Sequence, residues 1–143
     1  MKKTLAIILC VVTLIGVLQM PMFAAESDIM PLNNNTAISD VSFVIDSNGL
    51  AIIDVGYTGY YGVTTGGTIT TKLQKRFMGV FWSTVDIGTE DKVWVDQSSE
   101  YDFSVEHTYQ LEDTGTYRVV VNFVISGTGG ADDEIELTRQ ATW

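Results

Sequence analysis

Apolar and polar residues alternate along most of this chain from Ala37 to its end. Alternation with a period of two places successive side chains on opposite faces of a β-strand. No stretch after Ala37 repeats apolar residues at the spacing of a helix. The pattern therefore predicts an all-β fold.

Turn-forming residues interrupt the alternation at intervals of roughly 8–12 residues, which is typical of a β-sandwich or a small barrel. We expect seven or eight antiparallel strands, and a loop at Gly59–Gly67. The expected strands are Ile38–Asp46, Leu50–Thr58, Thr68–Phe77, Val80–Ile87, Val93–Val95, Tyr101–Tyr109, Thr116–Ser126 and Glu134–Thr142.

The alternation also assigns the faces of these strands. Val120 and Val124 add apolar residues to the second face of Thr116–Ser126, so this strand is predicted to be central. The first and last strands are predicted to be edges. The side chains expected to share the inward faces are Val41, Phe43, Ile45, Ala51, Ile53, Val55, Tyr57, Ile69, Leu73, Phe77, Tyr101, Phe103, Val105, His107, Tyr109, Tyr117, Val119, Val121, Phe123, Ile125, Ile135 and Leu137.

The N-terminus has the pattern of an export signal. Two lysines precede an apolar run, Thr4–Leu18, of a length typical of signal peptides and shorter than the ~20 residues of a membrane span. We expect cleavage after Ala25, a secreted protein without a stable membrane span, a flexible leader at 26–36 and a β-sandwich domain at 37–143. The alternative is that the run stays uncleaved as an anchor.

Cysteine usage and charge narrow the functional classes. The only cysteine, Cys10, lies within the predicted signal peptide, so the mature sandwich is expected to fold without a disulfide. The formal net charge is −10, and it falls to about −12 when Lys2 and Lys3 leave with the signal peptide. This charge disfavours nucleic acid and anionic membrane surfaces as partners.

A short motif, Asp113-Thr114-Gly115-Thr116-Tyr117, precedes the most apolar strand. Gly115 permits a tight bend, Asp113 suits a turn, and Tyr117 combines a ring to bury with a hydroxyl to bond. The motif resembles the tyrosine corner of immunoglobulin-like domains, with Val119 where that family often has a cysteine. The resemblance implies an immunoglobulin-like sandwich with Asp113, Gly115 and Tyr117 as structural residues.

A second resemblance covers about Thr68–Ile125. The segments Thr70–Lys75, Phe81-Trp82, His107–Tyr109 and Gly115–Val119 are similar to small exported proteins of Gram-positive bacteria. This resemblance implies a secreted β-sandwich and carries no active site with it.

Candidate catalytic residues are sparse. His107 is the only histidine, and it lies in mid-strand with no Gly-x-Ser-x-Gly motif in the chain, so we expect a structural residue rather than a catalytic base. One histidine without a mature cysteine cannot provide a tetrahedral zinc site. Paired carboxylates for glycoside hydrolysis are available among Asp86, Glu90, Asp91, Asp96 and Glu100, but none lies in a recognisable catalytic pattern. We expect no enzyme.

Two loops have candidate binding residues. Asp132, Asp133 and Glu134 follow a Gly-Gly turn, and their hard oxygen ligands would suit Ca²⁺, although a solvated acidic turn is the simpler interpretation. Apart from this possible calcium, no cofactor is predicted. Tyr60 and Tyr61 lie among glycines and threonines, where they would either cover the end of the sandwich or bind a ligand.

These observations favour a secreted, non-catalytic binding or interaction module whose ligand is an unknown extracellular protein or glycan. The first alternative is a cell-envelope structural protein that self-assembles through its edge strands. The second is a small hydrolase that uses two carboxylates about 5–10 Å apart in one cleft.

Overall fold

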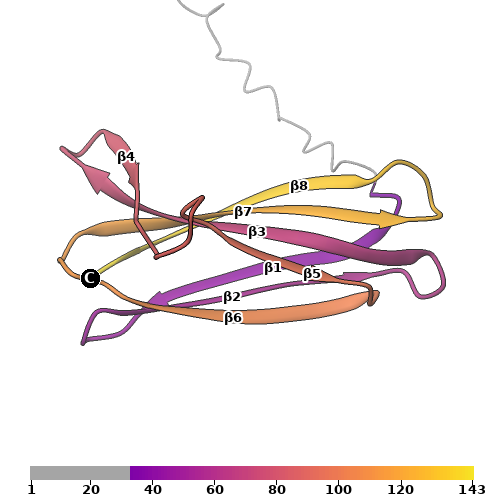
Figure 1. Cartoon of the computed structure of the whole chain (residues 1–143), viewed down its shortest axis with the longest axis horizontal. Coiled ribbons are helices and arrows are strands. Elements are labelled where there is room, and N and C mark those ends of the chain that lie inside the picture. The colour runs from indigo at the N-terminus through magenta and orange to yellow at the C-terminus, as the bar shows by residue number, and fades with distance from the viewer. Residues whose placement is uncertain (1–32) are drawn as a thin grey trace, which may run out of the picture. The chain divides into compact units, whose positions relative to one another are not determined.

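The computed structural model describes residues 33–143, which form eight β-strands and no helix (Figure 1). The predicted signal peptide and most of the predicted leader lie outside the described residues. Within 33–143, no helix is long and apolar enough to cross a membrane. The strands are β1 (Thr36–Ile45), β2 (Leu50–Gly59), β3 (Thr64–Phe77), β4 (Phe81–Thr84), β5 (Trp94–Ser98), β6 (Asp102–Gln110), β7 (Thr116–Gly127) and β8 (Asp133–Thr142).

The strands form two antiparallel sheets that pack as a sandwich (Figure 1). One sheet has the order β1-β2-β6. The other has the order β4-β3-β7-β8, and β5 pairs with the part of β3 that precedes its pairing with β4. The predicted all-β sandwich is confirmed, and so are the central position of β7 and the edge positions of β1 and β8.

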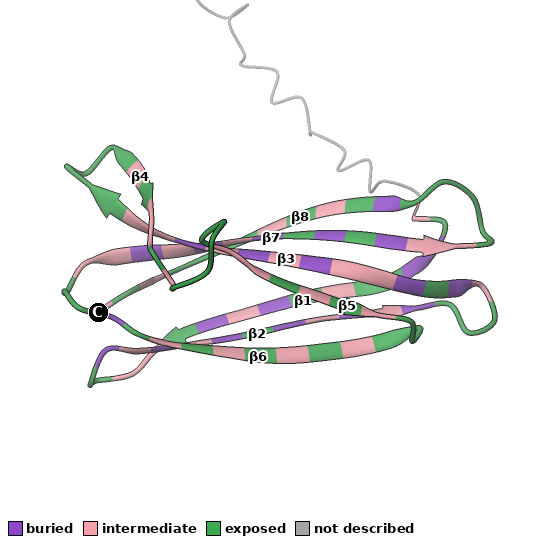
Figure 2. Cartoon of the chain, viewed as in Figure 1, coloured by how far each residue is buried: buried purple, intermediate pink, exposed green. Residues whose placement is uncertain are grey.

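The core lies between the sheets and follows the predicted alternation. Buried residues alternate with more exposed ones along β3 and β7 (Figure 2). The buried apolar side chains are Val41, Phe43, Ala51, Ile53, Val55, Tyr57, Ile69, Leu73, Leu111, Tyr117, Val119, Val121, Phe123 and Ile125. No disulfide is needed because these side chains form one continuous cluster.

The motif before β7 folds as the sequence predicts. The Tyr117 side chain is only 2% exposed, and its hydroxyl donates a hydrogen bond to the Asp113 carbonyl oxygen over 2.6 Å. Gly115 has a φ of 150°, a conformation that favours glycine. The hydrogen bond from the buried Tyr117 to a residue four positions earlier in the chain therefore closes the corner.

The predicted loop at Gly59–Gly67 is shorter than expected, because β3 begins at Thr64. Gly66 and Gly67 are strand residues that allow close packing. A Cβ at Gly67 would lie 2.6 Å from Ile125 Cδ1, and one at Gly66 would clash with the Ser98 carbonyl oxygen. These positions therefore need glycine because neighbouring strands of the sheet approach them closely, and not because the chain turns there.

Three other boundaries differ from the prediction. The strand expected at Val80–Ile87 is only Phe81–Thr84, and Tyr101 precedes β6 with 39% of its surface exposed. The predicted leader extended to Thr36, but Asn35 and Thr36 are buried. The fold therefore includes the last residues of that segment.

The position of Trp143 is also decided by the fold. Its indole lies over Gly49 in the β1–β2 turn, where a Cβ on Gly49 would be 2.6 Å from the ring. Backbone hydrogen bonds in both directions join Trp143 to Gly115, at 3.0 and 3.2 Å. The C-terminal residue therefore packs against the sandwich at the end that contains the corner.

Candidate functional site

The β2–β3 loop carries the two tyrosines that the sequence singled out. Tyr60 is 45% exposed and Tyr61 is 85% exposed. Tyr57, which alternation assigned to the core, is 2% exposed, and its hydroxyl donates to the Glu100 carbonyl oxygen over 2.9 Å. The loop therefore separates one structural tyrosine from two that face solvent.

A dense set of hydrogen bonds holds this loop in place. The Tyr60 amide donates to Thr64 Oγ1 (2.9 Å), and the amides of Val63 and Thr64 both donate to the Tyr60 carbonyl oxygen (3.0 Å each). Gly62 has a φ of 75°, which allows the chain to reverse at the tip. The exposed rings therefore extend from a fixed backbone.

A third tyrosine joins them from another part of the chain. Tyr101, just before β6, packs edge-on against Tyr61 with ring centroids 5.4 Å apart and an interplanar angle of 85°. Its carbonyl oxygen accepts a 2.6 Å hydrogen bond from the Gly59 amide. We call Tyr60, Tyr61 and Tyr101 the tyrosine cluster. The sequence does not single out Tyr101, because the alternation of β6 continues through it.

Near the tyrosine cluster, the outer face of the β1-β2-β6 sheet has a hollow of about 350 Å³. It forms where Gly56 on β2 pairs with Ser104 on β6, because neither residue has a large side chain. Ile38 lines one side of it. We call it the acidic hollow, since the carboxylates that line it are Asp40, Asp54, Asp102 and Glu106.

The acidic hollow is not apparent in the sequence, because its residues lie on three strands that only the sheet register brings together. The carboxylates named as hydrolase candidates lie elsewhere, in the β4–β5 loop, on β5 or in the following turn. The hollow therefore offers a second set of carboxylates for such a hydrolase, and this alternative stays a prediction.

The acidic triplet after the Gly-Gly turn is divided by the strand. Asp132 and Glu134 are exposed, whereas Asp133 is 6% exposed. Its Oδ1 and Oδ2 accept hydrogen bonds from the amides of Asn34 and Asn35, each at 2.8 Å. Among residues 33–143 no group of three potential ligands is arranged to hold a metal. Asp133 thus has a structural role, and the calcium site stays a prediction.

These contacts also set the electrostatics of Asp133. Burial by itself raises the pKa of the carboxyl, but the hydrogen bonds from the Asn34 and Asn35 amides, together with those from Thr36, outweigh burial, so the pKa lies below its ordinary value. Asn35 extends the network, because its side-chain amide donates to the Ala131 carbonyl oxygen (2.9 Å) and accepts from the Gly129 amide (3.1 Å). The β7–β8 turn is therefore fastened to the residues that precede β1.

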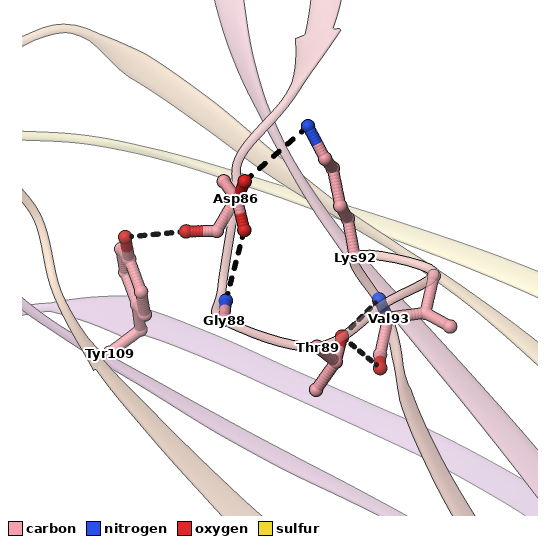
Figure 3. Close-up of polar contacts among 6 residues, drawn as sticks. All are labelled: Asp86, Gly88, Thr89, Lys92, Val93 and Tyr109. Atoms are coloured by element: carbon pink, nitrogen blue, oxygen red, sulfur yellow. Dashed lines mark hydrogen bonds and ion pairs between the residues drawn. The ribbon is translucent and has the colours of Figure 1, made fainter.

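The β4–β5 loop, which contains the candidate carboxylates Asp86, Glu90 and Asp91, is also ordered by its own contacts (Figure 3). The Asp86 carboxylate accepts from the Gly88 amide (3.1 Å) and pairs with Lys92 (3.4 Å), and both contacts lower its pKa, the amide having the larger effect. The Tyr109 hydroxyl on β6 donates to the Asp86 carbonyl oxygen over 2.9 Å. Asp86 is therefore committed to the loop.

The partners of His107 lie on the other sheet, and its structural role stays a prediction. Nε2 lies 2.7 Å from Asp96 Oδ2 on β5, and the imidazole stacks on Trp94 with centroids 4.9 Å apart. These contacts join β6 to β5 along one side of the sandwich. We call Trp94, Asp96 and His107 the side latch.

A scan against protein-family models and searches of curated proteins and solved structures found no match to this chain. We therefore infer the function from the residues themselves.

Proposed function

We propose that this chain is a secreted, non-catalytic domain that binds an extracellular protein or glycan through the tyrosine cluster. The observation that carries the proposal is the contact between Tyr61, 85% exposed, and Tyr101, which comes from a different connection. An exposed ring that is held edge-on by a second ring loses little conformational freedom when a ligand stacks on it.

The proposed binding surface also provides polar groups. Asp102, next to Tyr101 in the chain, lines the acidic hollow together with Asp40. Carboxylates beside aromatic rings can accept hydrogen bonds from sugar hydroxyls or pair with a basic peptide side chain. Both ligand classes in the proposal therefore match the same surface.

We also propose that the sandwich is immunoglobulin-like. Two features support this: the corner between Asp113 and Tyr117, and the strand order. Read as A-B-E opposite C′-C-F-G, the sheets β1-β2-β6 and β4-β3-β7-β8 correspond to the immunoglobulin pattern, with β7 as strand F. Binding through loops at the end of such a sandwich is a common use of the fold.

The test is a screen of the chain from Glu26 onward, against a glycan array and immobilised extracellular proteins. The compact unit that begins at Leu32 contains every described strand, so this chain retains the fold. Any ligand found should lose at least about tenfold in affinity when Tyr61 and Tyr101 are both replaced by Ala, in line with the loss of aromatic anchors.

The matched control is Phe81→Ala, which removes an exposed aromatic ring on the β3–β4 hairpin. It should leave affinity unchanged. A ligand that binds the Tyr61→Ala/Tyr101→Ala variant as tightly as the wild type would place the binding surface elsewhere and overturn the proposal.

The acidic hollow favours the hydrolase alternative as a second candidate. A screen of chromogenic glycosides would test it, with Asp54→Asn and Glu106→Gln as variants that keep side-chain size. Turnover by the wild type that both variants abolish would establish an enzyme and replace the proposal of a non-catalytic domain.

A further inference from the structure

The β3–β4 hairpin projects from one end of the sandwich (Figure 1). Pairing between β3 and β7 ends at Lys75 and Tyr117, while β3 continues to Phe77 with β4 as its partner. Leu73, on the inward face of β3, is fully buried, but Phe77 on the same face is 60% exposed. The alternation that predicts a core position for Phe77 therefore extends past the core itself.

The tip of the hairpin is apolar and exposed. Met78 is 77% exposed, Val80 70% and Phe81 65%, and the exposed character of the hairpin is visible in Figure 2. We call Phe77, Met78, Val80 and Phe81 the hairpin tip. A cluster of large apolar side chains on a projecting turn disfavours solubility and is typical of an interaction surface.

The backbone of the tip gives a second, independent sign. Met78 has a φ of 51°, in the left-handed region that Gly and Asn adopt most readily. The next residue, Gly79, has a φ of 74°, and the Val80 amide donates a hydrogen bond to the Phe77 carbonyl oxygen over 3.2 Å. The turn thus retains an exposed methionine at a position where Asn or Gly would be favoured both by the backbone and by water.

The segment that contains the hairpin has a charge opposite to that of the whole chain. No Asp or Glu occurs from Val55 to Val85, whereas Lys72, Lys75 and Arg76 do. Lys75 pairs with Asp113 over 3.0 Å, and Lys72 and Arg76 form no ion pair within residues 33–143. The strands of the hairpin are therefore basic in an acidic protein, although Asp86, Glu112 and Asp113 line a hollow together with Lys75.

Trp82 on β4 lies opposite Arg76 on β3, directly behind the tip. The centroid of its ring lies 4.3 Å from Arg118 Cζ and 5.8 Å from Arg76 Cζ. Arg118 is held in turn by Gln74, whose Oε1 accepts a hydrogen bond from Arg118 Nε over 2.8 Å. The hairpin thus has an apolar tip followed by a layer of tryptophan and cationic side chains.

We propose that the hairpin tip docks this domain on an anionic phospholipid bilayer. The order of its layers matches the bilayer surface: Met78, Val80 and the two phenylalanines would enter the acyl region, while Trp82 would lie among the headgroups, the position that tryptophan prefers. Arg76, the register partner of Trp82, would meet the lipid phosphates. A second copy of the same tip fits less well, because the basic strands of the two hairpins would repel each other.

The carboxylates of the acidic hollow do not oppose this orientation. At about 3.3 Å per residue, the 14 residues of β3 extend roughly 45 Å from the β2–β3 loop to the hairpin. Charges beyond about 8 Å are largely screened at physiological salt. The carboxylates of the acidic hollow would therefore lie outside the reach of the lipid charge, and the tyrosine cluster would face away from the membrane.

The test is flotation of the chain from Glu26 onward with two kinds of vesicle, phosphatidylcholine alone and phosphatidylcholine with phosphatidylglycerol. We expect co-flotation with the anionic vesicles only, and a loss on raising the salt concentration. Met78→Asn combined with Val80→Ser should reduce the bound fraction at least tenfold, without harming the fold, because Asn suits the left-handed turn position. Arg76→Glu should reduce the fraction that floats with the anionic vesicles.

The control is Ile38→Ser with Val44→Ser, which removes two apolar side chains that are 63% and 55% exposed on β1. This variant should float like the wild type. Brominated lipids should quench the fluorescence of the bound wild type, and Trp82→Phe should remove most of that quenching while flotation persists.

Three results would each overturn the proposal. One is a wild type that floats with neither kind of vesicle. Another is equal flotation of the Met78→Asn/Val80→Ser variant and the wild type. The third is light scattering in which the wild type is dimeric and that variant monomeric, which would mean that a second copy covers the tip. None of these results bears on ligand binding by the tyrosine cluster, which is measured without lipid.

Discussion

At the scale of single residues, the polar groups that matter most are those that the core encloses. Asp133 and Asn35 lie within one network that joins the start of β1, the β2–β3 loop and the β7–β8 turn. Asn35 also accepts a hydrogen bond from Thr64 Oγ1 at its carbonyl oxygen. The position of the tyrosine cluster therefore depends on buried side chains.

Asp133→Asn should destabilise the domain by about 2 kcal/mol at pH 7, because a buried carboxylate that accepts two amides is replaced by a neutral group with one acceptor oxygen. The pKa of Asp133 is lower in the folded chain than in the unfolded chain. Its contribution is therefore complete above the ordinary pKa of about 3.9 and is lost as the pH falls through the folded value.

Urea denaturation of the wild type and this variant, from pH 7 down to pH 2.5, measures the effect. The difference in free energy of unfolding should shrink below about pH 4. Asp132→Asn, in the exposed neighbour, should cause no comparable loss. A difference that stays constant over the whole pH range would contradict the role assigned to the Asp133 carboxylate.

At the scale of elements, different contacts join the two sheets along the two sides of the sandwich. On one side the edge strands β1 and β8 lie near each other, and on the other the side latch joins β6 to β5. β5 is short and pairs only with β3, so it has few contacts of its own. The side latch is therefore expected to hold β5 in register.

A double-mutant cycle of Asp96→Asn and His107→Gln should give a coupling energy of about 1–2 kcal/mol, as expected for half-buried partners in direct contact. The measurement is chemical denaturation of the wild type, the two single variants and the double variant at pH 7. Additive losses, with coupling near zero, would mean that Trp94 stacking alone secures β5.

At the scale of the whole molecule, the charge distribution and the edges determine how copies behave toward each other. Glu134 and Glu136 lie on the exposed edge strand β8. Charged side chains on an edge oppose strand pairing between molecules. Self-assembly through edges, the first alternative at the sequence level, is therefore expected only when these charges are removed.

Glu134→Val with Glu136→Val should convert a monomer into oligomers at micromolar concentration, measured by size-exclusion chromatography with light scattering. Glu112→Val, in the exposed connection between β6 and β7, serves as the control because it lies off the edge and should remain monomeric. Oligomers in the wild type would instead support the structural alternative.

The alternation of side chains determined much of this protein without any tertiary information. It specified the strand faces, the central β7, the buried Tyr57 and the corner at Tyr117, because a period of two and a short motif are local properties of the chain. The exposure of Tyr60 and Tyr61 was not determined in this way, since a break between alternating segments allows either a cover over the end of the sandwich or exposed rings.

Only the tertiary structure decided which residues from distant segments meet. The contact of Tyr101 with Tyr61, the hollow around Gly56 and the His107 contacts depend on sheet register, which no single segment encodes. Phe77 alternates like a core residue and is exposed because β3 extends past the core. Net charge likewise comes from the sequence, but its division into an acidic hollow and a basic hairpin follows from the fold.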